Sequence, residues 1–179
     1  MRKLVLLVMG AGILMMAGCK TEEIKPIPAD VEHQRMLENE NIVQIADTSG
    51  EFKTFAKLID AAGLRDTLSS SGPYTVFAPT DNAFDKLGKD KLDSLMKPEN
   101  RQQLRDILTY HVVSGKLKAS DIIRSDNLTT LNGKMLGVHT VGTKVMVDNA
   151  DVIQTDIMAK NGVIHPIDTV LMPKDVKSF

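Results

Sequence analysis

The spacing of apolar and polar residues divides the chain into a helical first half and a strand-like second half. Between residues 41 and 63, apolar side chains recur every three or four positions, which predicts two helices interrupted near Ser49–Gly50. Gly63 follows the second helix and ends it. From Leu128 to Met172, short runs rich in β-branched residues alternate with turn residues. Helices followed by strands indicate an α+β domain.

The segment between the two halves predicts a buried strand and further helices. Residues 74–78 have the composition of a short buried strand, and Pro79 ends it. The side-chain oxygens of Thr80–Asp81 are suited to cap the helix that follows. Pro98 opens the longest predicted helix, because its missing N–H is not needed in the first turn.

Turn residues divide the second half into short strands. Asn132–Gly133 and Asn161–Gly162 predict tight hairpins, since both residue types tolerate a positive φ. Residues 145–147 form a β-rich run that stops at a polar pair. Residues 163–167 and 170–172 are predicted to make the last strands.

The first residues have the layout of a secretory signal. Arg2 and Lys3 precede an apolar run from Leu4 to Met16. This run is short for a retained membrane anchor, because a spanning helix needs about 20 apolar residues. Two small residues then lead to Cys19, the only cysteine of the chain. Residues 1–18 are therefore predicted to be a signal peptide.

The position of Cys19 resembles a bacterial lipobox, in which signal peptidase cuts before a cysteine that carries diacylglycerol. Met16 stands where the lipobox usually has Leu, Val or Ile. The resemblance implies a lipid on Cys19 that holds the protein in the cell envelope, at the outer membrane or the cell surface. An ordinary signal peptide with an incidental cysteine is the alternative. Residues 19–38 are polar, contain two prolines and are predicted to be a flexible tether.

Composition and motifs argue against several functions. Among 179 residues, 42% are apolar and 25% are charged, which is typical of a globular protein. A net charge of -1 gives no attraction to nucleic acid, and an aromatic content of 4% without Trp argues against base or sugar stacking. We find no metal-ligand spacing, no phosphate loop and no nucleophile elbow. The sequence therefore predicts no metal, no cofactor and no enzyme activity.

Three segments occur in a characteristic order and at characteristic distances: residues 74–84, 108–113 and 161–173. Together they resemble the fasciclin, or FAS1, domain family: its first conserved block, its Tyr-His segment and its second block. The resemblance covers residues 39–175 and implies the FAS1 fold, a wedge of two small β-sheets with N-terminal and flanking helices. Pro166 stands where the family more often has a β-branched residue, so a kink, a bulge or an edge position is expected there.

The resemblance also implies a function. Fasciclin domains occur in secreted and surface-anchored proteins that mediate adhesion, so the chain is interpreted as a membrane-anchored adhesion or protein-interaction module. Its expected partner is a protein or a component of the extracellular matrix, and no nucleic acid. An accessory or ligand-binding lipoprotein that serves a larger envelope complex is the alternative. The oligomeric state stays open.

Tyr110 and His111 are candidate partner-binding residues, because the resemblance implies a role for the Tyr-His segment in receptor binding. The residues themselves favour another interpretation. His111 lies on the apolar stripe of its helix, which predicts a buried neutral histidine whose ring nitrogens bond to the backbone. An effect of this segment on binding then acts through local folding. His165 is likewise interpreted as structural.

Asp156, Ile157 and Met158 form the second candidate. They resemble the Asp-Ile segment that integrin-binding fasciclin domains present before the second block, although Gln154–Thr155 replaces the Glu-Pro pair that often precedes it. In that role, the carboxylate coordinates a receptor-bound cation and Met158 supplies a soft apolar contact. The alternative is that Asp156 and Ile157 simply complete a turn and a strand.

Overall fold

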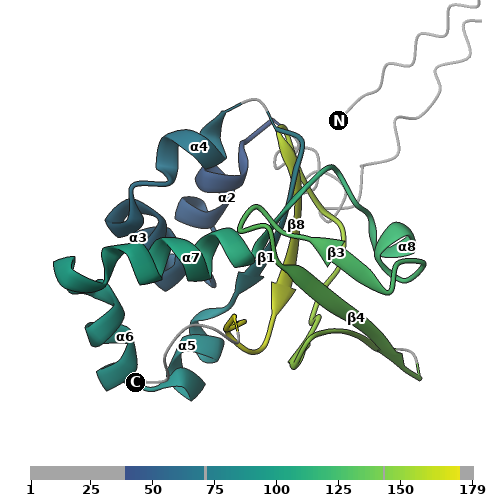
Figure 1. The fold of residues 1–179 in the computed structure, drawn as a ribbon. Coiled ribbons are helices and arrows are strands. Elements are labelled where there is room, and N and C mark those ends of the chain that lie inside the picture. The colour runs from purple at the N-terminus through teal and green to yellow at the C-terminus, as the bar shows by residue number, and fades with distance from the viewer. Residues whose placement is uncertain (1–38, 71, 143, 174–179) are drawn as a thin grey trace, which may run out of the picture.

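The computed structural model describes residues 39–70, 72–142 and 144–173 (Figure 1). The predicted signal peptide, the lipidation site Cys19 and the tether therefore lie outside the described residues. Over those three ranges, no helix is both long and apolar enough to cross a membrane. Among the described residues, both hydrophobic cores consist of residues between Ile42 and Leu171.

Helices dominate the first half and strands the second, which confirms the α+β class. The helices are α2 (Ile42–Thr48), α3 (Lys53–Ala62), α4 (Arg65–Ser69), α5 (Asp81–Leu87), α6 (Lys89–Met96), the 3-10 helix η1 (Pro98–Asn100), α7 (Arg101–Tyr110) and α8 (Ala119–Ile122). The strands are β1 (Tyr74–Pro79), β2 (Val112–Ser114), β3 (Asn127–Thr129), β4 (Met135–Val141), β5 (Lys144–Val147), β6 (Ala150–Asp151), β7 (Ile157–Ala159) and β8 (Gly162–Ile167).

The first two helices form where the apolar spacing predicts them. The Asn41 side chain accepts a hydrogen bond from the backbone N–H of Gln44, and the Gln44 side chain accepts one from the N–H of Asn41, both at 2.9 Å. This capping box starts α2. Gly63 ends α3 with φ 68°, a left-handed conformation that glycine adopts without steric cost.

The predicted cap of α5 is wrong in part. Thr80 precedes α5, but its side chain makes no capping bond, and its buried hydroxyl has no partner among the described residues. Asp81 accepts a hydrogen bond from the backbone N–H of Thr54, at 2.9 Å. Asp81 therefore caps α3. The sequence pattern reveals a capping carboxylate but cannot tell which helix it serves, because the donor lies 27 residues away.

Two predicted boundaries are also wrong. Pro98 opens η1, and α7 begins only at Arg101, so α7 and α3 have the same length of 10 residues. Residues 170–172 form no strand. Val170 packs into the core beside the helices and Leu171 into the core between the sheets. These two residues are apolar because they are buried, although they pair with no strand.

The two Asn-Gly turns differ. Asn132–Gly133 joins β3 to β4, and only its glycine has a positive φ, at 80°. In the second turn, Gly162 already pairs with Ala159 as the first residue of β8. The hairpin loop is therefore Lys160–Asn161, one residue earlier than predicted.

Two four-stranded sheets make up the strand half. The first has the order β2-β1-β8-β7, in which β1 and β8 are parallel and the other neighbours antiparallel. The second is antiparallel throughout, in the order β3-β4-β5-β6. Helices α2 to α7 cover one face of the first sheet and the second sheet covers the other (Figure 1). Isolated bridges at Val113–Thr130 and Val152–Ile167 join the sheets.

Successive side chains of β1 and β8 point to opposite faces of the first sheet and therefore belong to different cores. Val76 and Ile164 point to the helices, whereas Phe77 and Ile167 point to the second sheet. The first sheet is thus buried on both faces. This explains why β8 is buried at every position.

Pro166 lies in β8, a central strand, without breaking a ladder. The carbonyl oxygens of Asn161 and Ile167 accept bonds from the β1 side, so odd-numbered residues of β8 face β1. The Pro166 carbonyl accepts from the N–H of Ile153, at 2.8 Å, on the other side, which β7 does not reach. The proline nitrogen therefore points away from β1, where its missing N–H breaks no bond of the β1–β8 ladder. Pro166 thus lies in a central strand, beyond the end of β7 and beside the Ile153 segment.

Candidate functional site

His111 follows α7 and is fully buried. Its Nε2 accepts a hydrogen bond from the backbone N–H of Leu171, at 3.0 Å, so Nδ1 carries the proton and donates to the carbonyl oxygen of Ile107, at 2.8 Å. Burial lowers the pKa of His111 to about 4, against the opposing effect of the Ile107 carbonyl. The ring ties α7 to the C-terminal segment, as expected of a buried neutral histidine, and offers no surface to a partner.

Tyr110, the last residue of α7, is also buried. Its hydroxyl donates to Asp148 Oδ2 at 2.6 Å and lies 3.2 Å from the carbonyl oxygen of Met135. Asp148 Oδ1 in turn accepts from the N–H of Gly137, at 2.9 Å. Burial raises the pKa of the Tyr110 hydroxyl, and the Asp148 carboxylate raises it further. Tyr110 therefore joins α7 to β4 and to the turn after β5.

Asp156 connects the start of β7 to α8. Its Oδ1 accepts a hydrogen bond from the N–H of Ala119, the first residue of α8, at 2.9 Å. Its backbone has φ 61°, in the left-handed region that aspartate tolerates better than most residues. The described residues contain no group of three or more His, Cys, Asp or Glu side chains that could hold a metal ion. In this arrangement the Asp156 carboxylate caps a helix.

His165 completes the same cluster from β8. Its Nδ1 accepts from the N–H of Asp156, at 3.3 Å, and its Nε2–H donates to the Leu117 carbonyl, at 3.1 Å. Burial lowers the pKa of His165, although the Leu117 carbonyl and the Asp156 carboxylate oppose this. The ring stacks on Phe77 with centroids 5.7 Å apart. Asp156, His165 and the segment before α8 thus form one hydrogen-bonded unit.

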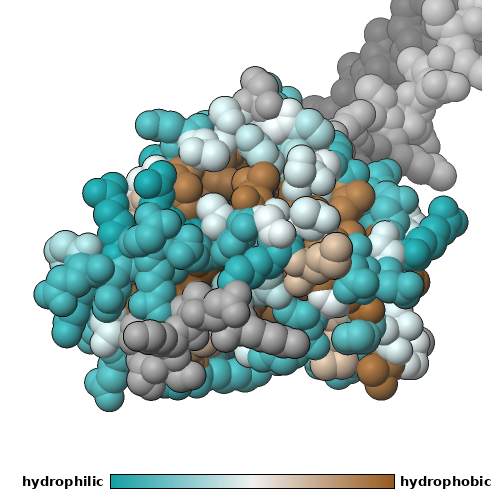
Figure 2. Space-filling model, in the orientation of Figure 1, coloured by the Kyte–Doolittle hydropathy of each residue, from teal (hydrophilic) through white to brown (hydrophobic). Residues whose placement is uncertain are grey.

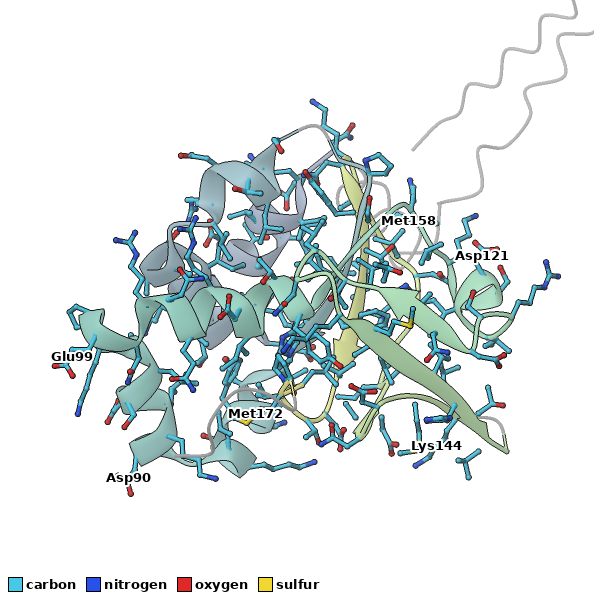
Figure 3. All side chains as sticks on the ribbon, in the orientation of Figure 1. Asp90, Glu99, Asp121, Lys144, Met158 and Met172 are labelled. Atoms are coloured by element: carbon cyan, nitrogen blue, oxygen red, sulfur yellow. The ribbon has the colours of Figure 1, made fainter. Side chains whose placement is uncertain are left out.

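Ile157 and Met158 lie in β7, the edge strand of the first sheet. The Ile157 side chain is buried in the core beside the helices. Met158 is half-buried and points to the other face of the strand. Figure 3 shows Met158 on the side of the molecule that carries α8 and Asp121. Of the three candidate residues, only Met158 offers an apolar side chain to the surface.

The exposed part of this region lies just before Asp156. Ile153 is 59% exposed, and Gln154 and Thr155 are exposed as well. These three residues border an open hollow of about 680 Å³, whose other lining residues are Lys144, Val145, Asp151, Val152 and Asp168. The N–H of Ile153 bonds to β8, so the backbone that presents the side chain is fixed. No pattern in the sequence marks Ile153 as exposed, because it follows the apolar Val152 and precedes two polar residues, as the last residue of a buried run also would.

Asp168 and His165 do not form a catalytic pair. Asp168 Oδ2 accepts from Lys86 Nζ at 2.8 Å, and its Oδ1 accepts from the Asp151 N–H at 2.9 Å and the Thr169 hydroxyl at 3.0 Å. Partial burial opposes ionisation, but these bonds lower the pKa of Asp168. Both side chains therefore serve the fold.

Comparison with known proteins agrees with this architecture. Residues 50–173 match the fasciclin domain family. Protein sll1483 of Synechocystis sp. is 38% identical over 165 residues, which cover 92% of this chain and 89% of that protein. Immunogenic protein MPB70 of Mycobacterium bovis is 33% identical over 168 residues, which cover 91% of this chain and 84% of that protein.

A solved structure shares the fold. The FAS1 domain pair of the insect cell adhesion molecule Fasciclin I aligns with a TM-score of 0.70 at 19% identity, over 78% of this chain and 53% of that chain. The likeness confirms the predicted FAS1 fold, with its helices and two four-stranded sheets. The chain belongs to the fasciclin domain family, a family of non-enzymatic proteins associated with cell adhesion and extracellular interactions.

Proposed function

We propose that the chain is a lipid-anchored adhesion or interaction module of a cell envelope, which binds a protein or a matrix component outside the cell. The observation that carries this proposal is the match of residues 50–173 to a family associated with cell adhesion. The anchor is diacylglycerol on Cys19, because the only thiol stands where a short apolar run ends. Residues 20–38 then connect the anchor to the domain.

The binding surface that we propose is the segment from Ile153 to Met158. Its exposed residues lie beside an open hollow, and the Asp156 cap and the bond of Ile153 to β8 hold its backbone. A preformed backbone lowers the entropic cost of binding. Tyr110 and His111 act in this proposal as positioning residues, since both are buried and join α7 to the strands.

The surface chemistry favours weak binding by each copy. The hollow beside Ile153 is open, so a partner buries only a modest area there. A lipid anchor places many copies in one plane, and linked copies gain effective concentration without new contacts. Strong adhesion therefore requires many anchored copies per unit of membrane area.

Beads coated with the lipid-free chain from Lys20 onward, at increasing density, test this function. We expect binding to cells or matrix to rise more steeply than in proportion to density, and soluble monomer to compete poorly. Binding that rises only in proportion to density, or no binding at any density, would contradict adhesion by avidity.

The anchor has its own test. Mass spectrometry of the mature N-terminus should find Cys19 as the first residue with a diacylglyceryl group, and Cys19→Ala should leave the precursor uncut by the lipoprotein peptidase. An unmodified Cys19, or cleavage well downstream of it, would overturn the anchor and leave the adhesion test unaffected.

A further inference from the structure

A polar hollow of about 560 Å³ opens at the end of the first sheet where β1 and β8 begin. In Figure 1 this end of β8 lies at the top of the domain, beside α2 and α4. The hollow is lined by amide, hydroxyl and ammonium side chains and by backbone: Asn39, Asn41, Gln44, Ser69, Ser70, Gly72, Pro73, Lys116, Lys160, Asn161 and Gly162. No function discussed above uses it.

Two glycines shape the base of this hollow. A Cβ on Gly162 would lie 1.9 Å from the Tyr74 carbonyl oxygen, and one on Gly72 would lie 2.3 Å from the Asn161 carbonyl oxygen. Side chains are thus excluded where the two strands begin. Asn161 holds the rim: its Oδ1 accepts from the N–H of Ile42, and its Nδ2 donates to the carbonyl oxygens of Leu68 and Ser70. The hollow is therefore a built feature of the fold.

Four side chains around the hollow supply N–H donors, whereas the Asn161 amide and the Ser70 hydroxyl already donate to backbone carbonyls. The side-chain oxygens of Asn41 and Gln44 accept backbone N–H groups in the capping box, which leaves their amide NH₂ groups to donate outward. Lys116 and Lys160 are exposed, and neither makes an ion pair within the described part of the chain. Glu40 lies in sequence between two lining residues but does not line the hollow. Its carboxylate accepts a hydrogen bond from the Thr48 hydroxyl, at 3.3 Å.

Among the described residues, no carboxylate lines this hollow, although the whole chain carries a net charge of -1. A donor-rich rim with two ammonium groups suits a phosphate, whose oxygens only accept hydrogen bonds. The position of the hollow relative to the predicted tether indicates which molecule carries that phosphate. Asn39, the first described residue, lines the hollow, so the predicted tether leaves the domain at this rim.

A flexible chain of 20 residues has an r.m.s. span of roughly 25 Å, so the predicted tether between the proposed anchor and Asn39 would keep the rim close to the bilayer. We propose that this hollow binds the phosphate of anionic lipid headgroups, so that the domain docks on the membrane that carries its anchor. The proposal rests on the anchor at Cys19 for the choice of ligand source. Docking fixes which face of the domain is turned away from the membrane.

The lipid-free chain from Lys20 onward tests the site without help from the anchor. It is mixed with vesicles of phosphatidylglycerol and phosphatidylcholine, and with vesicles of phosphatidylcholine alone. We expect sedimentation with the anionic vesicles only, and shifts of the backbone amide NMR signals of Lys160 and Gly162. Each lysine near an anionic surface contributes roughly fivefold, so Lys116→Gln with Lys160→Gln should weaken vesicle binding by about 25-fold.

The matched control removes two other exposed lysines, Lys57→Gln with Lys97→Gln, and should change vesicle binding less than twofold. Equal losses in both double variants would show non-specific charge attraction and overturn the site. Inorganic phosphate at the same phosphate concentration is the second arm: amide shifts as large as those with vesicles would assign the hollow to a soluble anion and overturn docking. Absence of shifts in both arms would overturn the site altogether, while the state of Cys19 is decided separately by mass.

Discussion

The segment around Tyr110–His111 and the segment from Ile153 to Met158 both contain residues that the family resemblance singles out, but their surroundings are opposite. Tyr110 and His111 are buried, and their polar atoms bond to β4, to the turn after β5 and to the C-terminal segment. The second segment runs along a sheet edge and leaves three side chains exposed. A buried, fully bonded motif reports how the domain holds together, whereas the exposed edge can differ in chemistry without cost to the fold.

Hydrophobic exposure follows the same division. Met135 is 70% exposed and Val141 63% exposed, both on β4, while the helical half buries nearly all its large apolar side chains. Figure 2 shows hydrophobic surface at the lower right, where the β4–β5 hairpin lies, among hydrophilic side chains. The three most exposed large apolar side chains among the described residues, Met135, Val141 and Ile153, thus lie in the strand half.

The largest effect is expected from His111→Ala. It removes the ring that accepts from Leu171 and donates to Ile107, and leaves a cavity, which should cost about 3–5 kcal/mol of unfolding free energy. Urea unfolding followed by circular dichroism measures it. The matched control is His139→Ala, an exposed histidine, which should change stability by less than about 0.5 kcal/mol. Similar midpoints for the two variants would contradict a structural role for His111.

Acid should weaken the same region. Because the pKa of His111 falls from 6.5 in the unfolded chain to about 4 in the folded one, the unfolded state binds more protons between these values. The contribution of His111 to the unfolding free energy is therefore fully present above pH 6.5. It decreases by about 3 kcal/mol as the pH falls towards 4. Unfolding free energies from pH 7.5 to 4.5 measure the slope. An NMR titration in which the folded His111 ring protonates near pH 6.5 would refute this.

Tyr110→Phe should have an intermediate effect. It deprives the Asp148 carboxylate of its hydroxyl donor and should cost about 1–2 kcal/mol. Tyr74→Phe is the control, since the Tyr74 hydroxyl only faces the exposed Ser70 hydroxyl at 3.4 Å, and it should cost less than about 0.5 kcal/mol. Chemical denaturation of both variants decides; equal costs would mean that the Tyr110–Asp148 bond does not hold α7 to the strands.

Asp156→Ala should have the smallest effect on stability. It removes the cap of α8 and should cost about 1 kcal/mol. Asp156→Asn keeps an oxygen acceptor and tolerates the left-handed backbone, so it should restore most of that loss. If Asp156→Ala and a chelator each abolished bead adhesion while the unfolding midpoint stayed unchanged, the carboxylate would be a cation-dependent contact and not a cap.

The sequence predicts helices and strands well where residues within one segment determine the local structure. The helix pair α2–α3 follows from apolar spacing, a local capping box and a terminal glycine. The strand at Tyr74 and the Asn132–Gly133 hairpin follow from short-range patterns as well. The capping box, the terminal glycine and the hairpin turn each act within a few positions of the chain, and the Tyr74 strand is marked by its own composition although its partners are β2 and β8.

Predictions fail where a distant partner decides. Asp81 caps α3 and not its own helix, and the Val170–Leu171 pair is buried without a strand partner. The site shows the same limit. Burial of His111 was predictable from its place on an apolar stripe, but the use of the Asp156 carboxylate was not, because its donor lies on α8, 37 residues away.

The most direct test of the account compares two exposed isoleucines on opposite sides of the proposed surface's boundary. Ile153 lies within it, whereas Ile123, 50% exposed, lies at the end of α8 outside it. Bead adhesion of Ile153→Asp at fixed density should fall at least tenfold with an unchanged unfolding midpoint, because a charge then replaces the apolar contact. Ile123→Asp should adhere like the unsubstituted chain. Full adhesion by Ile153→Asp, or equal loss by both variants, would contradict the assignment of binding to this edge.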